Sequence, residues 1–248
     1  PPLGDNDGIP VFSAADHYVD NYEKISSDHL DSFQRDGVNP FMDERHWREI
    51  EASTERLLRR YSAPGLKVLD VGVGMGRLLE RFPELDRYGM DISTGYLKVA
   101  QEKSIKVCMS KIEDMPFRSD YFDICVCTDV LEHVIDLNLA ISRILDVLKP
   151  GGILVVRVPY REDLSGYLVP GFPYDLVHLR SFDESQLVIL FSKIFRHDVL
   201  ETVLTGWTAG PSRWGHGYKY LRKFSLGLHR ICSLVFPFLS DAFSRFFR

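Results

Sequence analysis

Short apolar runs alternate with stretches of helical periodicity through the middle of the chain. The apolar runs fall at about 67–71, 86–90, 105–108, 122–128 and 152–158, and the helical stretches lie near 75–82, 94–103, 137–149 and 183–194. Runs such as ILVVRV are apolar at nearly every position, which is typical of parallel strands covered on both faces. The pattern predicts an α/β fold with a doubly wound, mostly parallel sheet.

The two ends of the chain have a different pattern. Apolar residues recur at helical spacing from Trp47 to Tyr61, residues 11–40 predict short helices, and residues 1–10 resemble a loose end. Apolar positions between Tyr220 and Val235 also follow helical spacing. We therefore expect an N-terminal helical lid region at 1–62, a ligand-binding domain at 63–211, and a basic aromatic C-terminal segment at 212–248 that forms a helical appendage.

The charge is distributed unevenly between these parts. The whole chain has a formal net charge of −5, but residues 212–248 carry seven Lys or Arg against one acid, Asp241. Residues 1–211 are therefore strongly acidic, which argues against a nucleic acid partner. For the basic aromatic segment, three roles stay open: packing on its own domain, contact with an anionic membrane surface, or homodimer formation.

The cysteines and the apolar runs limit where the protein is expected to act. Cys108, Cys125, Cys127 and Cys232 form no C-x-x-C pair, and three of them fall in predicted strands. They resemble buried apolar residues of a cytoplasmic, reducing compartment. No signal peptide is recognised, and no uncharged apolar run approaches the ~20 residues of a membrane-spanning helix.

A glycine-rich motif carries most of the functional information. Residues 68–77 read VLDVGVGMGR, so that Asp70 ends an apolar run and Gly72, Gly74 and Gly76 follow at alternate positions. Asp91 ends the next run, 21 positions after Asp70. Glycines allow backbone to approach a ligand, and an acid at the second strand end can accept ribose hydroxyls. The alternative is a glycine-rich turn without a ligand.

The spacing of this motif differs from that of a dinucleotide site, which requires G-x-G-x-x-G. G-x-G-x-G preceded by an acid resembles the class I S-adenosylmethionine-dependent methyltransferases. Four further stretches resemble successive motifs of their small-molecule branch, which contains the ubiquinone and menaquinone methyltransferases: residues 110–117, 121–134, 148–159 and 178–187. The resemblance covers about residues 66–200. It implies a Rossmann-like sheet of seven strands, S-adenosylmethionine as the cofactor, and a small-molecule methyl acceptor.

The resemblance also implies cofactor contacts. Asp70 would interact with the amino group of S-adenosylmethionine, and Asp91 would bind both ribose hydroxyls. The full set of expected cofactor residues is Asp70, Gly72, Gly74, Gly76, Asp91, Ile92, Ile112, Glu113 and Thr128. Lys111 stands where the family has an acid that contacts adenine. Because lysine has no acceptor, adenine recognition is expected to shift to backbone near Ile112 and to apolar packing.

The candidate catalytic residues are His133, Asp129 and His178. Asp129, Glu132 and His133 resemble an acid, acid and histidine set of quinone O-methyltransferases that can hold a divalent cation. A structural role in the turn, a general base and a metal site stay open for Glu132 and His133, and no metal ligand is assigned. His178 follows a long stretch, 159–180, that we expect to form part of the substrate lid.

The first expectation for the reaction is O-methylation, because histidine titrates near neutral pH and suits the removal of a hydroxyl proton. The alternatives are an N- or C-methyltransferase, or a catalytically inactive protein that binds S-adenosylmethionine and serves as a scaffold. Lys111 is the feature that favours the inactive alternative, and the intact glycines with Asp91 argue against it.

Overall fold

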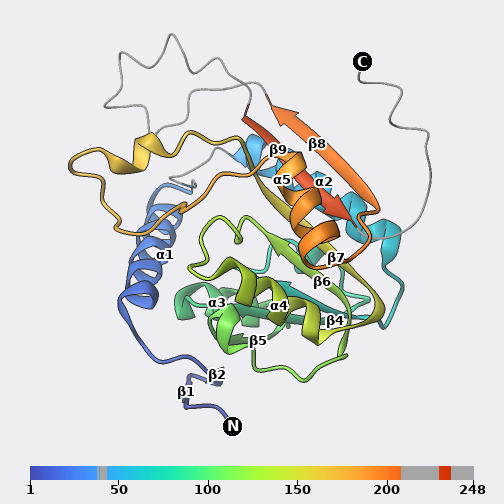
Figure 1. Ribbon diagram of the computed structural model, residues 1–248. Helices are drawn as coiled ribbons and strands as arrows, with labels where there is room; N and C mark the ends of the chain where they lie inside the picture. Colours follow the sequence, from blue (N-terminus) through green and yellow to red (C-terminus); the bar gives the residue numbers. More distant parts are fainter. Residues whose placement is uncertain (38, 40–43, 208–228, 236–248) are drawn as a thin grey trace.

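A computed structural model describes residues 1–37, 39, 44–207 and 229–235, and one sheet runs through it in the order β1-β2-β5-β4-β3-β6-β7-β9-β8 (Figure 1). Five parallel strands form its middle: β3 (Lys67–Val71), β4 (Asp86–Asp91), β5 (Lys106–Met109), β6 (Phe122–Thr128) and β7 (Leu148–Tyr160). All five lie within about two residues of the predicted ranges, except that β7 begins four residues earlier.

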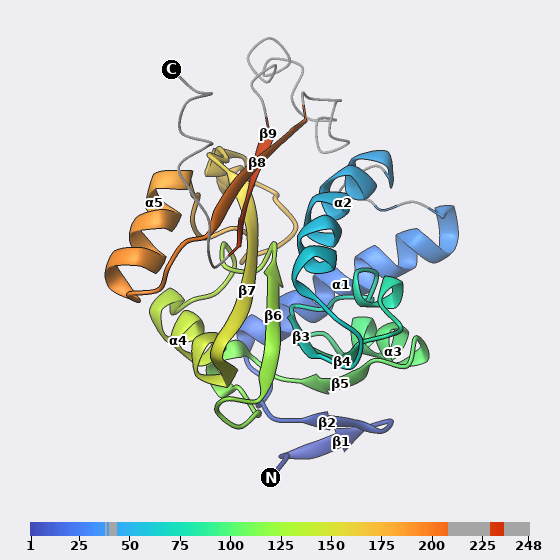
Figure 2. The ribbon, with the colours of Figure 1, turned by 90° about the vertical axis from the view of Figure 1, so that its right-hand side faces the viewer.

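Helices cover both faces of this sheet. In Figure 2, α2 (Glu44–Tyr61) and α3 (Thr94–Glu102) lie on one side, and α4 (Leu137–Val147) and α5 (Glu184–Ile189) lie on the other. Alternate residues of β3 serve the two faces: Val68 packs in the core under α2 and α3, and Leu69 packs in the core under α4 and α5. The predicted doubly wound α/β fold is confirmed.

Two strands complete a seven-stranded sheet that runs from β5 to β8. These are β8 (Glu201–Trp207) and β9 (His229–Val235), and β9 is antiparallel to both of its neighbours, β7 and β8. The sequence predicted a helix through residues 229–235, which is wrong. An apolar run of this length fits either period, and the edges of β7 and β8 supply hydrogen-bond partners for a strand. The rest of the basic aromatic segment lies outside the described residues.

The N-terminal residues form a hairpin rather than the expected loose end. Strands β1 (Gly4–Asn6) and β2 (Ile9–Val11) pair across Asp7 and Gly8, whose φ angles are 54° and 82°. Two consecutive positive φ angles are typical of a type I′ turn, which matches the twist of the strands that it joins. Val11 pairs with Met109 of β5, so the hairpin extends the sheet.

A single helix, α1 (His17–Asp36), replaces the short helices expected before residue 40. Asp16 caps its first turn by accepting a hydrogen bond from Val19 N, and Gly37 ends it with a φ of 65°. The sequence concealed its length because several of its buried residues are polar: Asn21, Ser26, His29 and Ser32. Among the helices that the structure describes, none has the length and apolar character needed to cross a membrane.

Two other helices differ from the prediction. Residues 75–82 form only a short 3-10 helix, η1 (Leu79–Arg81), because left-handed glycines precede it and Pro83 follows it. Helix α5 begins at a capping box made by Asp183 and Gln186, and it continues as a π-helical turn, η4 (Leu190–Ile194). The predicted helix at 183–194 is therefore present, with a change of winding in its middle.

The burial of His29 in α1 predicts that the stability of the protein depends on pH. His29 is 4% exposed, its Nδ1 lies 2.6 Å from the hydroxyl of Tyr96 in α3, and burial lowers its pKa to about 4. The unfolded chain binds the proton near pH 6.5, so stability is lost as the pH falls from about 6.5 to 4, by at most about 1.4 kcal/mol per pH unit. We expect His29→Gln to flatten this acid loss in chemical unfolding, whereas the exposed His17→Gln on the same helix leaves it unchanged.

Candidate active site

The glycine-rich turn after β3 has three left-handed residues with different surroundings. Gly72, Gly74 and Gly76 have φ angles of 77°, 51° and 72°. A Cβ on Gly72 would lie 2.2 Å from Val130 Cγ2, and one on Gly76 would lie 2.6 Å from Ile105 Cδ1. A Cβ on Gly74 would meet nothing within 4 Å. Gly72 and Gly76 therefore permit close packing, and Gly74 leaves open space above the turn.

Alanine substitutions at Gly72 and Gly74 are therefore expected to have different effects on stability and on ligand binding. Gly72→Ala should destabilise the fold by roughly 1–3 kcal/mol or more, because backbone strain adds to the clash with Val130. Gly74→Ala carries only the backbone strain, but its methyl group enters the space that a ligand would use. We expect Gly72→Ala to lower the unfolding midpoint more, and Gly74→Ala to lose more cofactor affinity than stability. Equal losses of stability in the two variants would contradict this assignment.

A cavity of about 190 Å³ opens beside the turn. It is lined by Trp47, Glu51, Thr54, Asp70, Gly72, Val73, Gly74, Met75, Arg77, Leu78, Thr128, Asp129 and Arg157. Asp70 is 3% exposed, and its Oδ1 has no hydrogen-bond partner among the described residues. Burial raises the pKa of this carboxyl group well above its usual value. The buried oxygen without a partner could accept a hydrogen bond from the ammonium group of a ligand.

Asp91, at the end of β4, is held by two backbone groups. Gly74 N donates to Oδ2 and Ser93 N donates to Oδ1, each at 2.9 Å. Burial raises the pKa of Asp91, although backbone hydrogen bonds from Ser93, Gly74 and Ile92 act in the opposite direction. Each carboxylate oxygen can accept a second hydrogen bond, so the fixed carboxylate could bind two ligand hydroxyls. Ile92 follows directly in the turn to α3.

The residues expected on the adenine side surround a short 3-10 helix, η2 (Ile112–Asp114). Ile112 is 7% exposed, and the carbonyl of Glu113 accepts a hydrogen bond from Arg143 in α4. The Nζ of Lys111 lies 2.7 Å from Oδ2 of Asp16, the cap of α1. Lys111 therefore fastens α1 to the end of β5, which gives this departure from the family pattern a structural purpose.

Asp129 is paired with an arginine that the sequence analysis missed. Arg157 of β7 is 4% exposed, and its Nε and Nη2 donate to the carboxylate of Asp129 at 3.2 and 2.5 Å. Arg157 also donates to Ile50 O and Thr54 Oγ1 of α2. A lone charge inside the run ILVVRV was the available signal. Asp129 has a φ of 55°, and its side chain lines the cavity beside the glycine turn.

A second ionic cluster fastens α2 to the glycine turn. Glu51 is 5% exposed and accepts hydrogen bonds from Arg77 at 2.9 Å and from Arg81 at 2.6 Å. The guanidinium group of Arg77 stacks 4.2 Å from the ring of Trp47. Glu51, Arg77 and Trp47 all line the cavity. Helix α2 therefore supplies one wall of the cavity, through contacts that no sequence pattern indicated.

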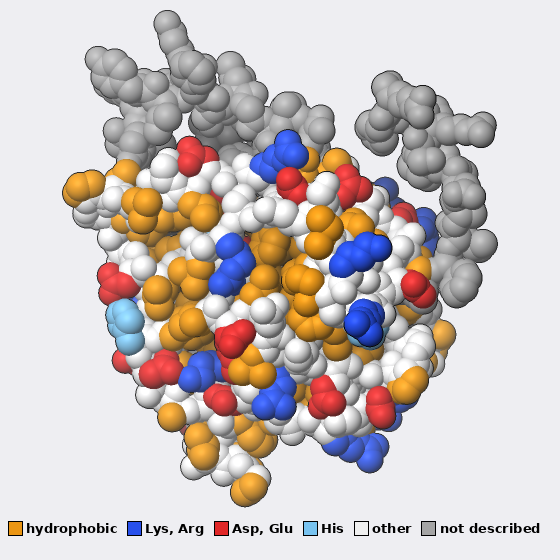
Figure 3. Space-filling model, in the orientation of Figure 1, with side chains coloured by type: hydrophobic (Ala, Val, Ile, Leu, Met, Phe, Trp, Pro, Cys, Tyr) orange, Lys and Arg blue, Asp and Glu red, His pale blue; other side chains and the backbone are white. Residues whose placement is uncertain are grey.

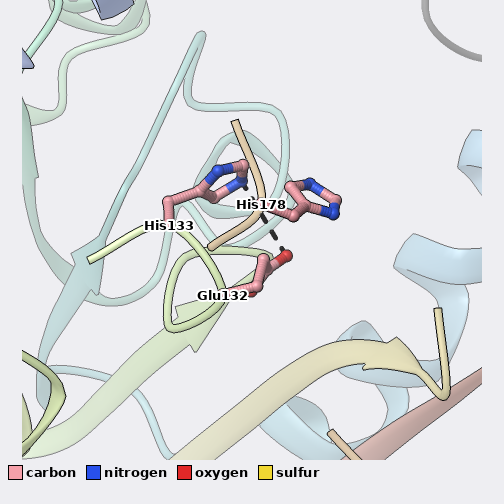
Figure 4. Close-up of side chains that lie close together, drawn as sticks. All are labelled: Glu132, His133 and His178. Atoms are coloured by element: carbon pink, nitrogen blue, oxygen red, sulfur yellow. Dashed lines mark ion pairs between the residues drawn. The ribbon is translucent and has the colours of Figure 1, made fainter. Parts of the chain in front are cut away.

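Figure 4 shows a further group, the histidine cluster, which we define as Glu132, His133 and His178. One potential ligand atom from each residue lies within 4.8 Å of those of the other two, and His133 Nε2 is 3.9 Å from Glu132 Oε1. The two imidazole rings meet edge to face with centroids 4.5 Å apart. The structure thus brings together two of the three candidate catalytic residues, His133 and His178, but not Asp129.

The Nδ1 atoms of His133 and His178 both have hydrogen-bond partners. His133 Nδ1 lies 3.0 Å from Val177 O and 2.9 Å from the hydroxyl group of Tyr22, which also donates to Val177 O at 3.1 Å. His178 Nδ1 pairs with the carboxylate of Glu162, which also accepts a hydrogen bond from Tyr167 at 2.7 Å. Burial lowers the pKa of His133 to about 3, with the nearby His178 acting in the same direction. No sequence pattern indicated Glu162 or Tyr167.

Helix α1 and the stretch 159–180 close over this cluster. Asn21 accepts hydrogen bonds from the backbone N–H groups of Asp175 and Leu176, and Tyr22 OH lies 2.9 Å from His133 Nδ1. The next residue of α1, Glu23, accepts a hydrogen bond at 2.8 Å from the backbone N–H of Thr94, which begins α3 three residues after Asp91. Helix α1 therefore connects the end of β4 with the histidine cluster.

Comparison with known proteins gives this arrangement a context. A protein family described as a methyltransferase domain matches residues 69–156. A demethylmenaquinone methyltransferase of Renibacterium salmoninarum is 27% identical over 75% of this chain and 80% of its own length. A ubiquinone biosynthesis O-methyltransferase of Bradyrhizobium sp. is 39% identical over 40% of this chain and 42% of its own length. The chain spans 54% and 62% of the length of two uncharacterized relatives from Methanocaldococcus jannaschii.

The fold agrees with these matches. The crystal structure of an S-adenosylmethionine-dependent methyltransferase from Thermotoga maritima superimposes with a TM-score of 0.59 at 16% identity. The superposition covers 88% of this chain and 98% of the other. The matched residues include the glycine turn, Asp91, and Glu132 with His133 after β6, whereas His178 lies beyond the matched segment. Residues 69–156 are therefore similar to the methyltransferase-domain family, and the fold is that of the solved S-adenosylmethionine-dependent methyltransferase from Thermotoga maritima.

Proposed function

We propose that this protein transfers a methyl group from S-adenosylmethionine to a hydroxyl oxygen of a small molecule. The observation that carries the proposal is that the cavity beside the glycine turn and the histidine cluster both use residues from the end of β6 and the turn after it. Thr128 and Asp129, at the end of β6, line the cavity beside the glycine turn, and Glu132 and His133 follow directly in the histidine cluster. Methyl transfer requires donor and acceptor to be aligned and shielded from water.

On the donor side, Asp70 would hold the amino group of the cofactor and Asp91 its ribose hydroxyls. Gly72, Gly74 and Thr128 would bound the methionine portion. Gly76 packs beneath the turn, and Ile92, Ile112 and Glu113 would flank the adenosine portion. Asp129 would stand at the border between donor and acceptor, positioned by Arg157 rather than acting as a base.

On the acceptor side, the histidine cluster is the place where a hydroxyl proton could be removed. At neutral pH His133 is uncharged, because burial lowers its pKa to about 3, so it can accept a proton but is a weaker base than the ordinary histidine expected from the sequence. Tyr22 and Tyr167 add aromatic surface at the cluster, and Ile135 and Leu179 are exposed beside it, at 60% and 38%. In Figure 3, hydrophobic side chains gather on the face that carries α1 and the stretch 159–180. An acceptor with an aromatic or apolar body fits this surface.

The names of the relatives support two kinds of acceptor atom. One relative is named for ubiquinone biosynthesis by O-methylation, and others are named for C-methylation in ubiquinone and menaquinone biosynthesis. The cluster of Glu132, His133 and His178 favours a hydroxyl acceptor, which has to lose its proton, and C- or N-methylation is the second candidate. The open space above Gly74 and the fixed carboxylate of Asp91 argue against an inactive scaffold.

The test is a methyl-transfer screen with S-adenosylmethionine carrying an isotope-labelled methyl group. The acceptors are matched sets of catechols, simple phenols, aromatic amines and quinols, and release of S-adenosylhomocysteine is measured. NMR of the product then identifies the methylated atom. Turnover of hydroxylated aromatics with the label on oxygen supports the proposal. Turnover of amines alone, or a label on ring carbon, would replace it with the second candidate.

We also propose a cytoplasmic setting and an interface role for the basic aromatic segment. Cys108, Cys125 and Cys127 are buried and unpaired, in accord with a reducing compartment. Residues 229–235 of this segment pair within the protein's own sheet, and the basic residues before and after them suit an anionic membrane surface, with a homodimer contact as the other proposal. Co-sedimentation with anionic but not neutral liposomes supports the membrane contact, whereas a concentration-dependent dimer without liposome binding supports the homodimer.

A further inference from the structure

An acid and a tyrosine hold the imidazole of His178 from outside the histidine cluster. The carboxylate of Glu162 pairs through Oε2 with Nδ1 of His178, and its Oε1 accepts a hydrogen bond from the hydroxyl group of Tyr167 at 2.7 Å. The ring centroids of Tyr167 and His178 are 5.2 Å apart. All three residues lie beyond 69–156, in the part of the chain that the methyltransferase-domain family does not match.

The path of the backbone explains why Glu162 and His178 meet. Arg161 N donates to Phe182 O at 2.7 Å, so the stretch 159–180 leaves the sheet and returns to it at the same place. Glu162 and His178 lie just inside this closure, and each of their side chains is only 16% exposed. The two side chains therefore face each other across the base of the stretch, in a position that the closure fixes.

The carboxylate determines which nitrogen of His178 carries the proton. Burial raises the pKa of Tyr167, so its hydroxyl group keeps its proton and donates to Glu162. A carboxylate can only accept, so Nδ1 of His178 donates to it, and Nε2 is left with a lone pair. The carboxylate also favours positive charge on the ring, because opposite charges in contact stabilise the ionised form.

His133, the other histidine of the cluster, has no such partner among the described residues. Its Nδ1 lies against Val177 O and the hydroxyl group of Tyr22, and burial lowers its pKa to about 3. Its nearest acid is Glu132, whose Oε1 lies 3.9 Å from its Nε2. Burial raises the pKa of Glu132 well above its usual value, so this acid is held in its neutral form. Of the two histidines, His178 is the one equipped to take a proton.

We propose that His178 is the base that removes the acceptor's proton, and that Glu162 is the positioning residue that fixes its tautomer and stabilises its charged form. Tyr167 holds Glu162 in place. The inference rests on the proposed function, because it names the base within the histidine cluster.

The step balances without any further reactant. The hydroxyl proton of the acceptor passes to Nε2 of His178 while the hydroxyl oxygen forms a bond to the methyl carbon. The bond between that carbon and sulfur breaks, and sulfur keeps the electron pair, which yields S-adenosylhomocysteine. His178 then releases the proton to water.

The tautomer of His178 is measured first, without S-adenosylmethionine or an acceptor. Histidine is labelled with nitrogen-15 in the full chain, and the NMR signals of His178 are identified by their loss in His178→Ala. At about pH 8.5, above the range in which an ordinary histidine is charged, the parent should show the proton on Nδ1. In Glu162→Ala the proton should move at least in part to Nε2. Glu102→Ala, at the exposed end of α3 that is remote from Asp91, is the matched control and should keep the parent signals.

Turnover is measured next, with an acceptor from the methyl-transfer screen. Glu162→Ala should lower kcat by roughly 10²-fold and leave the KM for the acceptor and the affinity for S-adenosylhomocysteine nearly unchanged. Glu162→Gln keeps an acceptor oxygen but not the charge and should lose less. Tyr167→Phe keeps the ring, loses the hydrogen bond to Glu162, and should lower kcat by about tenfold. A purely structural role for Glu162 would raise KM or lower thermal stability instead of lowering kcat alone.

Two results would overturn the proposal. Identical His178 signals in Glu162→Ala and the parent would show that Glu162 does not set the tautomer. A changed tautomer with an unchanged kcat would show that His178 is not the base. Absence of turnover in the parent with every acceptor would refute the proposed function and the base with it, whereas the tautomer result stands by itself. If Glu162→Ala is unfolded by thermal denaturation, Glu162→Gln decides by the same kcat measurement.

Discussion

Asp91→Ala is expected to weaken the binding of S-adenosylhomocysteine by about 100-fold or more. Two hydrogen bonds from ribose hydroxyls to a carboxylate are each worth roughly 1.5–3 kcal/mol, and the variant loses both. The effect is large because the carboxylate is already fixed by Gly74 N and Ser93 N, so no ordering of the side chain is required on binding. Isothermal titration calorimetry measures the difference directly.

The matched control for this change is Asp86→Ala. Asp86 begins the same strand, β4, but pairs with Lys106 at the opposite end of it, far from the glycine turn. We expect this variant to bind the product as the parent does. A dissociation constant of Asp91→Ala within twofold of the parent value, in folded protein, would show that Asp91 does not bind the ribose.

His178→Ala is expected to lower turnover by roughly 10²–10⁴-fold while it leaves the affinity for S-adenosylhomocysteine nearly unchanged. In the proposed function, the histidine cluster faces the methyl acceptor beside the β6 turn, and the cofactor contacts lie on the other side of that turn. Removing the imidazole therefore affects the activation of the acceptor and not the binding of the donor. Steady-state rates with an acceptor from the methyl-transfer screen, together with calorimetry, separate the two effects.

His197→Ala provides the comparison, because His197 is exposed after η4 and takes no part in the cluster. It should retain the parent rate. A rate for His178→Ala close to that of His197→Ala would return His178 to a structural role, in which it ties the stretch 159–180 to the turn after β6.

The parts of the fold that depend on local sequence pattern could be predicted from the sequence. Apolar runs such as Val68–Val71 predict parallel strands because both faces of these strands are buried, and the structure confirms this. The glycine spacing with Asp70 and Asp91 predicts a turn and two strand ends that meet, since parallel strands end at the same edge of a sheet. These signals need no knowledge of distant contacts.

The missed parts depend on contacts between distant residues. Glu162 and His178, or Arg157 and Asp129, are brought together only by the path of the chain, and no periodicity marks them. The length of α1 was concealed because its buried face is largely polar, as at Asn21. Residues 229–235 were read as helical because a short apolar run fits a helix or a strand until a neighbouring strand decides.

The central claim is that the glycine turn and Asp91 bind S-adenosylmethionine. Isothermal titration calorimetry of the full chain with S-adenosylhomocysteine tests it most directly, because it requires no acceptor. The account predicts one bound molecule per chain, with an affinity that Asp91→Ala removes and Asp86→Ala preserves. No binding of either S-adenosylmethionine or S-adenosylhomocysteine at millimolar concentration, in protein shown to be folded, would contradict it.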